Sequence, residues 1–375
     1  MAKSIQELLK IAVDRDASDL HLSSYIPPRV RVNGSLVSLD HPPLTPAETK
    51  SLAYSLLTDK QKKKFEEKLE LDFSFGIKQL GRFRANVFMQ KGSVAVAFRR
   101  FLPEMWSFAQ LGIPQRLAQL CFLPRGLVLV TGPTGSGKTT SLACMLEHVN
   151  HHRNVHIVTI EDPIEYFFTP DKAIVNQREL YVDTLSYPNA LRSALREDPD
   201  VVLVGEMRDQ ETVEATLKVA ETGHLTFSTL HTNSASETIS RIIDIFPSQY
   251  QTQVRIMLSM SLEAVITQAL LPRADGNGRV LAMEILIPNS AIRNLIRENK
   301  IHQIYSTMQM GQEKFGMQTF NQSLANLYFK KAISRETAMS MSSKPDELTD
   351  ILQRKEGLKV ASRTFTPSQQ RNRGR

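Results

Sequence analysis

The stretch LVLVTGPTGSGKTT, residues 127–140, joins an apolar strand to a glycine-rich turn and then to a segment that can begin a helix. Three later stretches, VHIVTIE, DVVLVGE and LTFSTLH, are also almost wholly apolar, and each is followed by a helical stretch. Strands that are apolar throughout and alternate with helices indicate a parallel sheet covered on both faces. This part of the chain is therefore predicted to have an α/β fold.

The chain before this fold shows a different pattern. In DLHLSS, RVRVNGSLVSL, GRFRANVFM and SVAVAFRRF, apolar and polar residues alternate with the period of two that half-buried strands have. The charged stretch DKQKKKFEEKLE between them is typical of a solvated helix. We therefore predict an α+β domain with a mainly antiparallel sheet.

Changes of pattern divide the chain into four parts. Two prolines and a glycine interrupt both periodicities within residues 102–114, which indicates a connection between domains. The terminal residues lose any apolar pattern. The predicted parts are an N-terminal domain over residues 1–105, a linker over 106–114, an α/β domain with a helical C-terminal part over 115–361, and a flexible basic tail over 362–375.

The composition is that of a globular protein, with 41% hydrophobic and 23% charged residues, and 375 residues are enough for two domains. No apolar run reaches the ~20 residues needed to cross a bilayer, and the N-terminus lacks the apolar core of a signal peptide. We therefore expect a cytoplasmic protein with at most peripheral membrane contact. The net charge of +7 is spread along the chain, so by itself it identifies no acidic partner. Cys121 and Cys144 lack metal-ligand spacing and are predicted to lie in the core.

The glycine-rich turn fits the phosphate-binding pattern G-x-x-x-x-G-K-[ST]. Its glycines would let successive backbone N–H groups point at phosphate oxygens, and the following helix would add its positive end. Lys138 is predicted to bridge the β- and γ-phosphates of a nucleotide, and Thr139 to ligate Mg²⁺. The alternative, a glycine-rich surface turn, does not explain the strand before it and the helix after it. The predicted phosphate-binding residues are Gly132, Pro133, Thr134, Gly135, Ser136, Gly137, Lys138, Thr139 and Thr140.

Two acidic residues end apolar strands at the sheet edge where this turn is expected. Glu161 follows VHIVTI, Glu206 follows DVVLVG, and ligands of parallel sheets bind beyond the carboxyl ends of the strands. Nucleotide hydrolysis needs one carboxylate near Mg²⁺ and one near the attacking water. We assign Glu206 to Mg²⁺, directly or through water, and Glu161 to the nucleophilic water, although the two roles could be exchanged. Either acid could instead cap a helix or lie in a solvated turn.

Histidine and arginine residues complete the set of candidates. His224 and His231 bracket the strand HLTFSTLH, so they lie at its opposite ends and cannot share a metal site. His231, at the carboxyl end, is placed to sense a γ-phosphate, but a structural role stays open for both histidines. Arg82 and Arg84 share one face of a strand, where they would either pair with phosphoryl charge or form the wet face of that strand.

In this order along the chain, GPTGSGKTT, TIEDPIEY, DVVLVGEMRD and AETGHLTFSTLHTNSA resemble the Walker A, Asp box, Walker B and His box of the secretion ATPase superfamily, which powers type IV pili and type II secretion. The resemblance extends over nearly the whole chain. Within this superfamily, AIRNLIRE followed by GMQTFNQSL is similar to the C-terminal signature of the pilus retraction ATPases. The tetracysteine zinc site of the extension ATPases has no counterpart in this sequence, so no zinc is expected. The signature residues are Ala291, Ile292, Arg293, Asn294, Leu295, Ile296, Arg297 and Glu298.

The resemblance implies an N-terminal PAS-like domain, a RecA-like ATPase domain and a homohexameric ring that binds ATP and Mg²⁺ between domains. The implied function is a motor that powers pilus retraction and twitching motility from the cytoplasmic face of the inner membrane. Its implied partners are a membrane platform protein and a paralogous retraction ATPase. In such motors AIRNLIRE is needed for retraction, while hydrolysis can survive its loss. The residues with implied catalytic roles are Lys138, Glu161, Glu206, His224, His231, Arg82, Arg84 and Arg99.

Other functions fit the sequence less well. An accessory retraction ATPase is the nearest alternative. A RecA-like nucleic-acid motor would need basic residues interleaved with aromatic ones, and this chain has one tryptophan and no such pattern, so no nucleic-acid partner is expected. A small-molecule kinase or a nucleotide-gated ring that barely hydrolyses ATP would not need the full set of acids.

Overall fold

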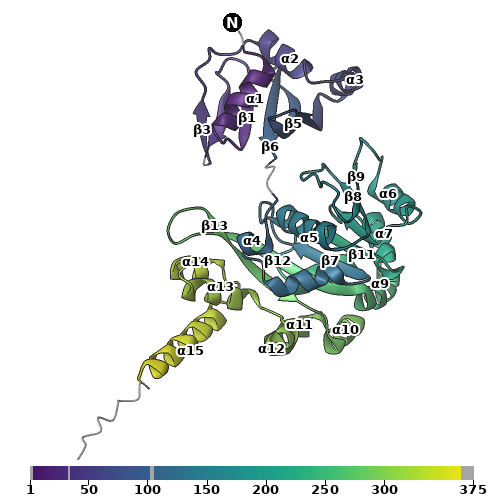
Figure 1. Cartoon of the computed structure of the whole chain (residues 1–375), viewed down its shortest axis with the longest axis vertical. Helices are drawn as coiled ribbons and strands as arrows, with labels where there is room; N and C mark the ends of the chain where they lie inside the picture. The colour runs from purple at the N-terminus through teal and green to yellow at the C-terminus, as the bar shows by residue number, and fades with distance from the viewer. Residues whose placement is uncertain (1–2, 33, 102–104, 365–375) are drawn as a thin grey trace, which may run out of the picture. The chain divides into compact units, whose positions relative to one another are not determined.

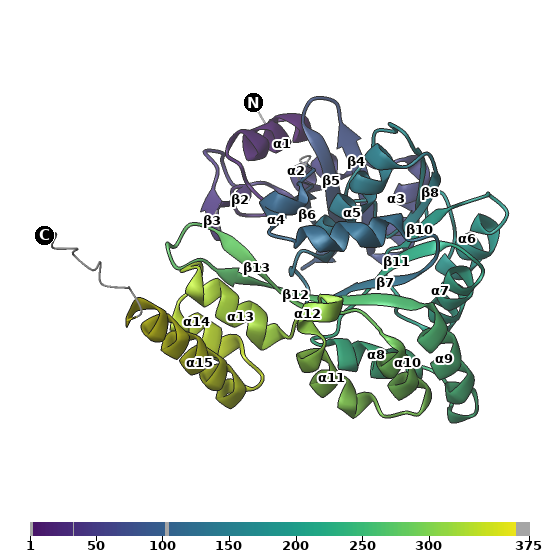
Figure 2. The ribbon, with the colours of Figure 1, turned by 60° about the horizontal axis from the view of Figure 1, so that its bottom comes forward.

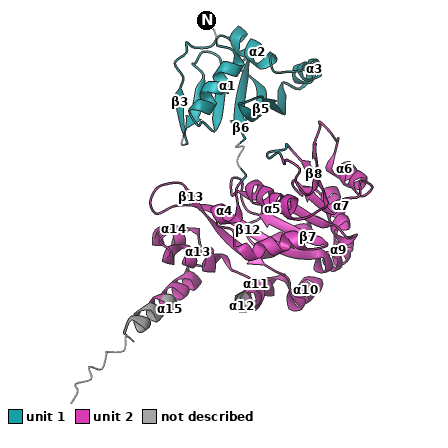
Figure 3. Cartoon of the chain, in the orientation of Figure 1, with its two compact units in different colours: residues 1–105, 163–167 teal, residues 106–162, 168–375 magenta. Residues whose placement is uncertain are grey.

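A computed structural model of the chain (Figure 1) describes residues 3–32, 34–101 and 105–364. Figure 3 shows that these residues form two compact units, which are residues 1–105 with 163–167 and residues 106–162 with 168–375. Residues 163–167, which the sequence analysis placed in the α/β domain, therefore group with the first unit. Of the tail predicted over 362–375, all but the first three residues lie outside the described residues.

The first unit is built on a six-stranded sheet with the order β3-β2-β1-β6-β5-β4. Every neighbouring pair in this sheet is antiparallel, which confirms the predicted α+β arrangement. Its strands are β1 Asp19–Leu22, β2 Arg29–Val32, β3 Ser35–Ser38, β4 Glu70–Ile77, β5 Gly81–Gln90 and β6 Ser93–Arg100. Its helices are α1 Ile5–Asp14, α2 Pro46–Tyr54 and α3 Asp59–Lys68.

Local sequence explains where these helices begin. Ser4, Thr45 and Thr58 each accept a hydrogen bond from the backbone three residues later, and the side chain there bonds back to the capping residue. This capping box satisfies N–H groups that the first turn of a helix leaves free.

The second unit is built on a seven-stranded sheet with the order β13-β12-β7-β11-β10-β8-β9. The pairs from β12 to β9 are parallel, which confirms the α/β prediction, whereas β13 is an antiparallel edge strand. Its strands are β7 Gly126–Thr131, β8 His156–Glu161, β9 Ile174–Glu179, β10 Val201–Val204, β11 Leu225–Leu230, β12 Leu262–Pro272 and β13 Arg279–Leu286.

Helices cover both faces of this sheet. Figure 2 shows α5 on one side of the strands and α8, α10 and α11 on the other. The helical elements are α4 Phe108–Leu111, η1 Gln115–Phe122, α5 Lys138–His152, α6 Tyr187–Ala194, α7 Gln210–Glu221, α8 Ala235–Asp244, α9 Ser248–Ser261, α10 Ser290–Arg297, η2 Ile301–Gln303, α11 Ile304–Met310, α12 Gln312–Phe315, α13 Phe320–Phe329, α14 Arg335–Met341 and α15 Pro345–Thr364. The predicted linker over 106–114 thus contains the short helix α4.

The sequence of β7 is apolar throughout because both faces of this strand are covered. Val128 and Val130 pack on the α5 side, while Leu127 and Leu129 pack on the side of α7, α8 and α9. All four side chains are fully buried. Complete burial of one such side chain contributes about 1.5–3 kcal/mol, so a polar residue on either face would weaken the sheet.

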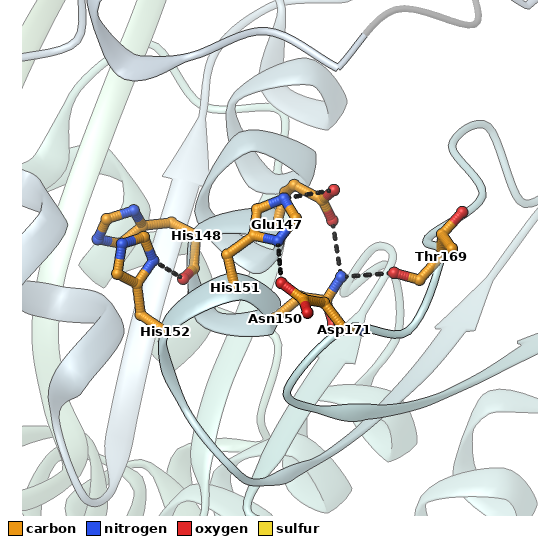
Figure 4. Close-up of polar contacts among 7 residues, drawn as sticks. All are labelled: Glu147, His148, Asn150, His151, His152, Thr169 and Asp171. Atoms are coloured by element: carbon orange, nitrogen blue, oxygen red, sulfur yellow. Dashed lines mark hydrogen bonds and ion pairs between the residues drawn. The ribbon is translucent and has the colours of Figure 1, made fainter.

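The end of α5 is tied to the loop before β9 (Figure 4). Asn150 donates to the carbonyl oxygen of Thr169 at 2.8 Å and accepts from the backbone N–H of Asp171 at 3.0 Å. His151 lies between two carboxylates, with Nδ1 2.7 Å from Asp171 and Nε2 3.1 Å from Glu147. These contacts fix one end of the helix whose other end begins at the glycine-rich turn.

Among the described residues, no helix is both long enough and apolar enough to cross a membrane.

Candidate functional site

The phosphate loop, residues 132–140, follows β7 directly. Gly132 has φ +136°, and a Cβ at this position would lie 2.3 Å from the backbone oxygen of Gln268 on β12. Only glycine fits such a close approach without moving a neighbouring strand. Gly137 has φ +88° and precedes Lys138, the first residue of α5. The loop therefore passes from a buried strand into a helix N-terminus, the arrangement that binds phosphate in many proteins.

Two side chains in this loop suit an anionic ligand. Lys138 is 9% exposed, and its Nζ donates to the backbone oxygens of Gly132 at 2.8 Å and Pro133 at 3.1 Å. The buried Ser136 hydroxyl has no hydrogen-bond partner within the described part of the chain. A buried hydroxyl without a partner is unfavourable, and a phosphate oxygen would supply one. The loop thus fits a nucleotide phosphate, as the sequence predicts.

The strand register brings the predicted acids to the same edge as the loop. Thr131 of β7 lies opposite Leu230 of β11, and Ile160 of β8 lies opposite Val204 of β10. Because β7, β11, β10 and β8 are parallel neighbours, the residues that follow them leave the sheet at one edge. The residues at this edge are Gly132 after β7, His231 after β11, Gly205 and Glu206 after β10, and Glu161 at the end of β8.

Glu161 is the last residue of β8 and is only 6% exposed. The Thr159 hydroxyl donates to Glu161 Oε1 at 2.6 Å, and Gln177 Nε2 on β9 donates to the same oxygen at 3.3 Å. Both donors fix the orientation of the carboxylate. A carboxylate held in this way can orient a water molecule and accept its proton.

Glu206 is held between the side chains of Arg208 and His231. Its Oε2 lies 2.7 Å from Arg208 Nη2, and its Oε1 lies 3.2 Å from His231 Nε2. Burial opposes ionisation of Glu206, but the hydrogen bonds and charges of Arg208 and His231 outweigh it, so the pKa of this carboxyl lies below its usual value. Glu206 is therefore ionised at neutral pH, as a carboxylate that faces Mg²⁺ must be.

Two residues of this edge were missed by the sequence analysis. Arg208 pairs with Glu206, and its signal was its place two residues after that acid in GEMRD. Tyr187, the first residue of α6, has a pKa raised by burial and by the nearby Asp162 and Glu161. No sequence pattern points to Tyr187, because its contacts depend on how α6 packs.

The Tyr187 hydroxyl lies against Gly205. A Cβ on Gly205 would be 2.8 Å from Tyr187 Oη, 3.3 Å from the oxygen of Ile160 and 3.4 Å from the Cα of Glu161. A glycine is thus required here by close packing, since its φ is not in the left-handed region. Tyr187 thereby contacts the short segment that carries Glu206.

Comparison with known proteins identifies the family. The type II/IV secretion system proteins match residues 1–329. The chain belongs to this family. It is 49% identical over 342 residues to the type IV pilus retractation ATPase PilT of Pseudomonas aeruginosa, an alignment that covers 91% of this chain and 99% of that protein.

Two further similarities are informative. The chain is 37% identical over 343 residues to the type IV pilus ATPase PilU of Pseudomonas aeruginosa, covering 92% of this chain and 90% of that protein. A crystal structure of the pilus retraction motor PilT with bound ADP has a TM-score of 0.87 and 55% sequence identity, and it covers 93% of this chain and 100% of that one. The fold of this secretion-family chain is therefore that of PilT.

His224 does not lie at the sheet edge that carries the phosphate loop, which is called the phosphate edge below. It precedes β11, and its Nδ1 lies 3.0 Å from the oxygen of Val219 and 3.3 Å from the Thr222 hydroxyl. Within the second unit it therefore joins α7 to β11, at the opposite end of that strand from His231. The predicted opposite placement of the two histidines is confirmed.

The candidate arginines of the first unit all have partners within that unit. Arg84 pairs with Asp72 across β4 and β5, and Arg99 Nε donates to Asp19 at 3.1 Å. Arg82 donates to the Ser74 hydroxyl at 2.5 Å, and its guanidinium lies 4.5 Å from the centroid of the Phe167 ring.

The AIRNLIRE segment forms α10 except for its last residue, Glu298. Ile292 and Ile296 are fully buried, while Leu295 is partly buried against the same core. Arg293 is structural, because it donates to the oxygens of Ser259 at 2.9 Å and Met260 at 3.2 Å, which end α9. Arg293 Nη2 lies 2.9 Å from Glu263 Oε1.

Arg297 differs from Arg293, because it is exposed and contacts Asn294 one turn earlier at 3.3 Å. It is thus the arginine of this segment that is available to a partner.

The metal candidates are oxygen ligands. Thr139, in the first turn of α5, and Glu206 offer the hydroxyl and carboxylate oxygens that Mg²⁺ prefers. Among the described residues, no cluster of three histidine, cysteine, aspartate or glutamate side chains could hold a metal ion.

Proposed function

We propose that this chain is an ATP-hydrolysing motor that works as a homohexamer and powers type IV pilus retraction. One observation carries the proposal. The phosphate loop, Glu161 and the Glu206–His231 pair leave one sheet edge, in a chain 49% identical to PilT over 91% of its length. ATP is the proposed substrate because a P-loop binds a nucleoside triphosphate.

The chemistry follows from the residues at this edge. Backbone N–H groups of the phosphate loop and Lys138 bind the β- and γ-phosphates of ATP. Thr139 and Glu206 would hold Mg²⁺, which when bound neutralises charge on the phosphate oxygens. Glu161 orients a water molecule whose oxygen attacks the γ-phosphorus. The bond from this phosphorus to the β–γ bridging oxygen breaks, and the proton of the water passes to Glu161.

His231 is the proposed sensor of the phosphate state. Its contact with Glu206 at 3.2 Å makes its position depend on what that carboxylate binds. We also propose the role that the family implies for His224, and for Arg82, Arg84 and Arg99, which would bring positive charge to the nucleotide in the assembled ring.

Force would come from movement of one domain against the other as ATP binds and products leave. The proposed partner is a platform protein at the cytoplasmic face of the inner membrane, with a paralogous retraction ATPase as a second partner. The accessory function of PilU is the alternative, and the lower identity of 37% makes it the second candidate.

The exposed Arg297 allows a test that separates retraction from hydrolysis. The full-length chain is expressed in a bacterium whose own retraction ATPase is deleted, and twitching is measured. The wild type should restore twitching, and Glu161→Gln should not. Arg297→Ala should abolish twitching and leave phosphate release from ATP within about 2-fold of wild type, since α10 is bound to the end of α9, where β12 begins, and the phosphate loop follows the other end of the sheet.

Arg192→Ala is the matched control, because Arg192 is also exposed and also bonds an asparagine three residues earlier, Asn189, at 2.7 Å. It should leave twitching unchanged. Failure of the wild type to restore twitching would refute the retraction motor, and loss of twitching in both arginine variants would refute the special role of Arg297.

A further inference from the structure

Glu284 is a buried carboxylate that the proposed hydrolysis does not use. It lies on β13 opposite Thr267 of β12 and is only 3% exposed. The Thr267 hydroxyl is 2.8 Å from the hydroxyl of Thr131, where β7 ends and the phosphate loop begins. A charged group at this depth is unfavourable unless hydrogen bonds satisfy its oxygens.

Two helices begin at this carboxylate. The backbone N–H of Ala235, the first residue of α8, donates to Glu284 Oε1 at 2.7 Å. The backbone N–H of Phe320, the first residue of α13, also donates to Glu284. Burial raises the pKa of the Glu284 carboxyl, and the free N–H groups and partial positive charge of the two helix N-termini offset part of this effect. Lys344 adds positive charge nearby, and Glu347 adds negative charge.

Residues 231–234, the turn before α8, connect the Glu284 carboxylate to the phosphate edge. Thr232 Oγ1 lies 2.7 Å from Thr238 Oγ1, and the Thr238 hydroxyl also donates to the oxygen of Ser234 at 2.7 Å. The turn is therefore fastened to the first turn of α8 and moves with it. Its other end is His231, which contacts Glu206 at 3.2 Å.

Glu284 lies beside α13 and also beside a cavity. Helix α13 is bound to β13, since the Met283 N–H donates to the Ser323 hydroxyl at 3.0 Å. A cavity of about 440 Å³ is lined by Pro133 of the phosphate loop, Ser234 and Glu284 itself. The cavity borders the turn before α8, and the carboxylate contact with Ala235 holds the end of this turn where the helix begins.

We propose that Glu284 is a positioning residue for ATP hydrolysis. By accepting the N–H of Ala235, its carboxylate fixes the start of α8 and thereby holds His231 against Glu206. The inference rests on the proposed function, because it concerns the acids that would hydrolyse ATP.

The test compares three variants of the full-length chain. Glu284→Ala removes both acceptor oxygens, Glu284→Gln keeps one, and Ser323→Ala removes a buried hydrogen bond from the same strand without touching α8. For each variant, kcat for ATP hydrolysis, the affinity for a fluorescent ADP and the melting temperature are measured. Hydrogen exchange is followed in peptides that cover residues 231–240.

A positioning role predicts a split between catalysis and binding. In Glu284→Ala, kcat should fall about 10-fold while ADP affinity stays within about 2-fold, because the phosphate loop is untouched. Exchange over residues 231–240 should be faster. Glu284→Gln should have an intermediate kcat, and Ser323→Ala should lose stability but keep kcat and the exchange rate of wild type.

The inference is overturned if Glu284→Ala and Ser323→Ala have the same kcat at similar stability. If Glu284→Ala does not fold, Glu284→Gln decides the question, and a wild-type kcat in that variant overturns the inference. Should wild type itself release no phosphate from ATP, the proposed function fails, and exchange over residues 231–240 then tests the positioning role by itself. Unchanged exchange in Glu284→Gln would overturn it.

Discussion

Gly205 is the position where one added methyl group should reveal how tightly the sheet edge beside the phosphate loop is packed. A Cβ on this residue would lie 2.8 Å from the Tyr187 hydroxyl, closer than the 3.0 Å below which real Cβ contacts essentially do not occur. The backbone of Gly205 has little freedom to retreat, because its N–H donates to Ile160 O at 2.8 Å and its oxygen accepts from Thr229 at 2.6 Å. The tyrosine ring must therefore move.

The expected cost follows from this geometry. Overpacking a tight site costs about 1–3 kcal/mol, and the remaining contacts of the methyl group, at 3.3 and 3.4 Å, add little, so we expect about 2 kcal/mol for Gly205→Ala. For a unit of this size, that lowers the melting temperature by about 4–8 °C. Because Glu206 follows directly, kcat should also fall, by about 10-fold.

Tyr187→Phe supplies the decisive second variant, since it removes only the clashing hydroxyl. By itself it should change stability by less than about 0.5 kcal/mol. In the double variant Gly205→Ala/Tyr187→Phe, stability and kcat should return most of the way to wild type, which gives a coupling energy of about 1–2 kcal/mol in a double-mutant cycle. Urea unfolding and phosphate release measure both quantities. Additive effects of the two substitutions would refute the reasoning.

Three further predictions concern stability and reactivity. Burial raises the pKa of Cys121 to about 12 and that of Cys144 to about 11, so iodoacetamide at pH 8 should modify neither thiol until urea unfolds the chain. The pKa of His151 is raised chiefly by its hydrogen bond to Asp171. The contribution of protonated His151 to the stability of the fold should therefore be complete below about pH 6.5 and be lost as pH rises through the raised pKa. Urea unfolding at several pH values should show this small dependence in the wild type and not in His151→Gln. Gly132→Ala should cost about 2–4 kcal/mol and abolish nucleotide binding, measured by urea unfolding and fluorescent-ADP titration.

Some parts of the fold and site could be predicted because the residue pattern within one short segment indicates how that segment is buried or where it ends in the sheet. The apolar runs that became β7, β8, β10 and β11 show burial directly, because a strand covered on both faces tolerates no polar side. The acids Glu161 and Glu206 could be placed because a parallel sheet brings the residues after its strands to one edge.

The parts that could not be predicted depend on contacts between distant segments. Tyr187 reaches the sheet edge of Glu161 and Glu206 only because α6 packs beside β8 and β10. Glu284 looks like an ordinary strand residue in RVLAMEIL, and its role appears only when β13 lies beside the start of α8 and α13. The sequence of the signature segment does not show that Arg293 bonds the end of α9, because this contact depends on α10 folding back onto that helix.

The central claim is that Glu161 drives ATP hydrolysis at a site completed by assembly, and phosphate release measured over a range of protein concentrations tests it most directly. With ATP and Mg²⁺, activity per chain should rise with concentration and vanish in Glu161→Gln. Activity that does not depend on concentration and survives Glu161→Gln would contradict the account.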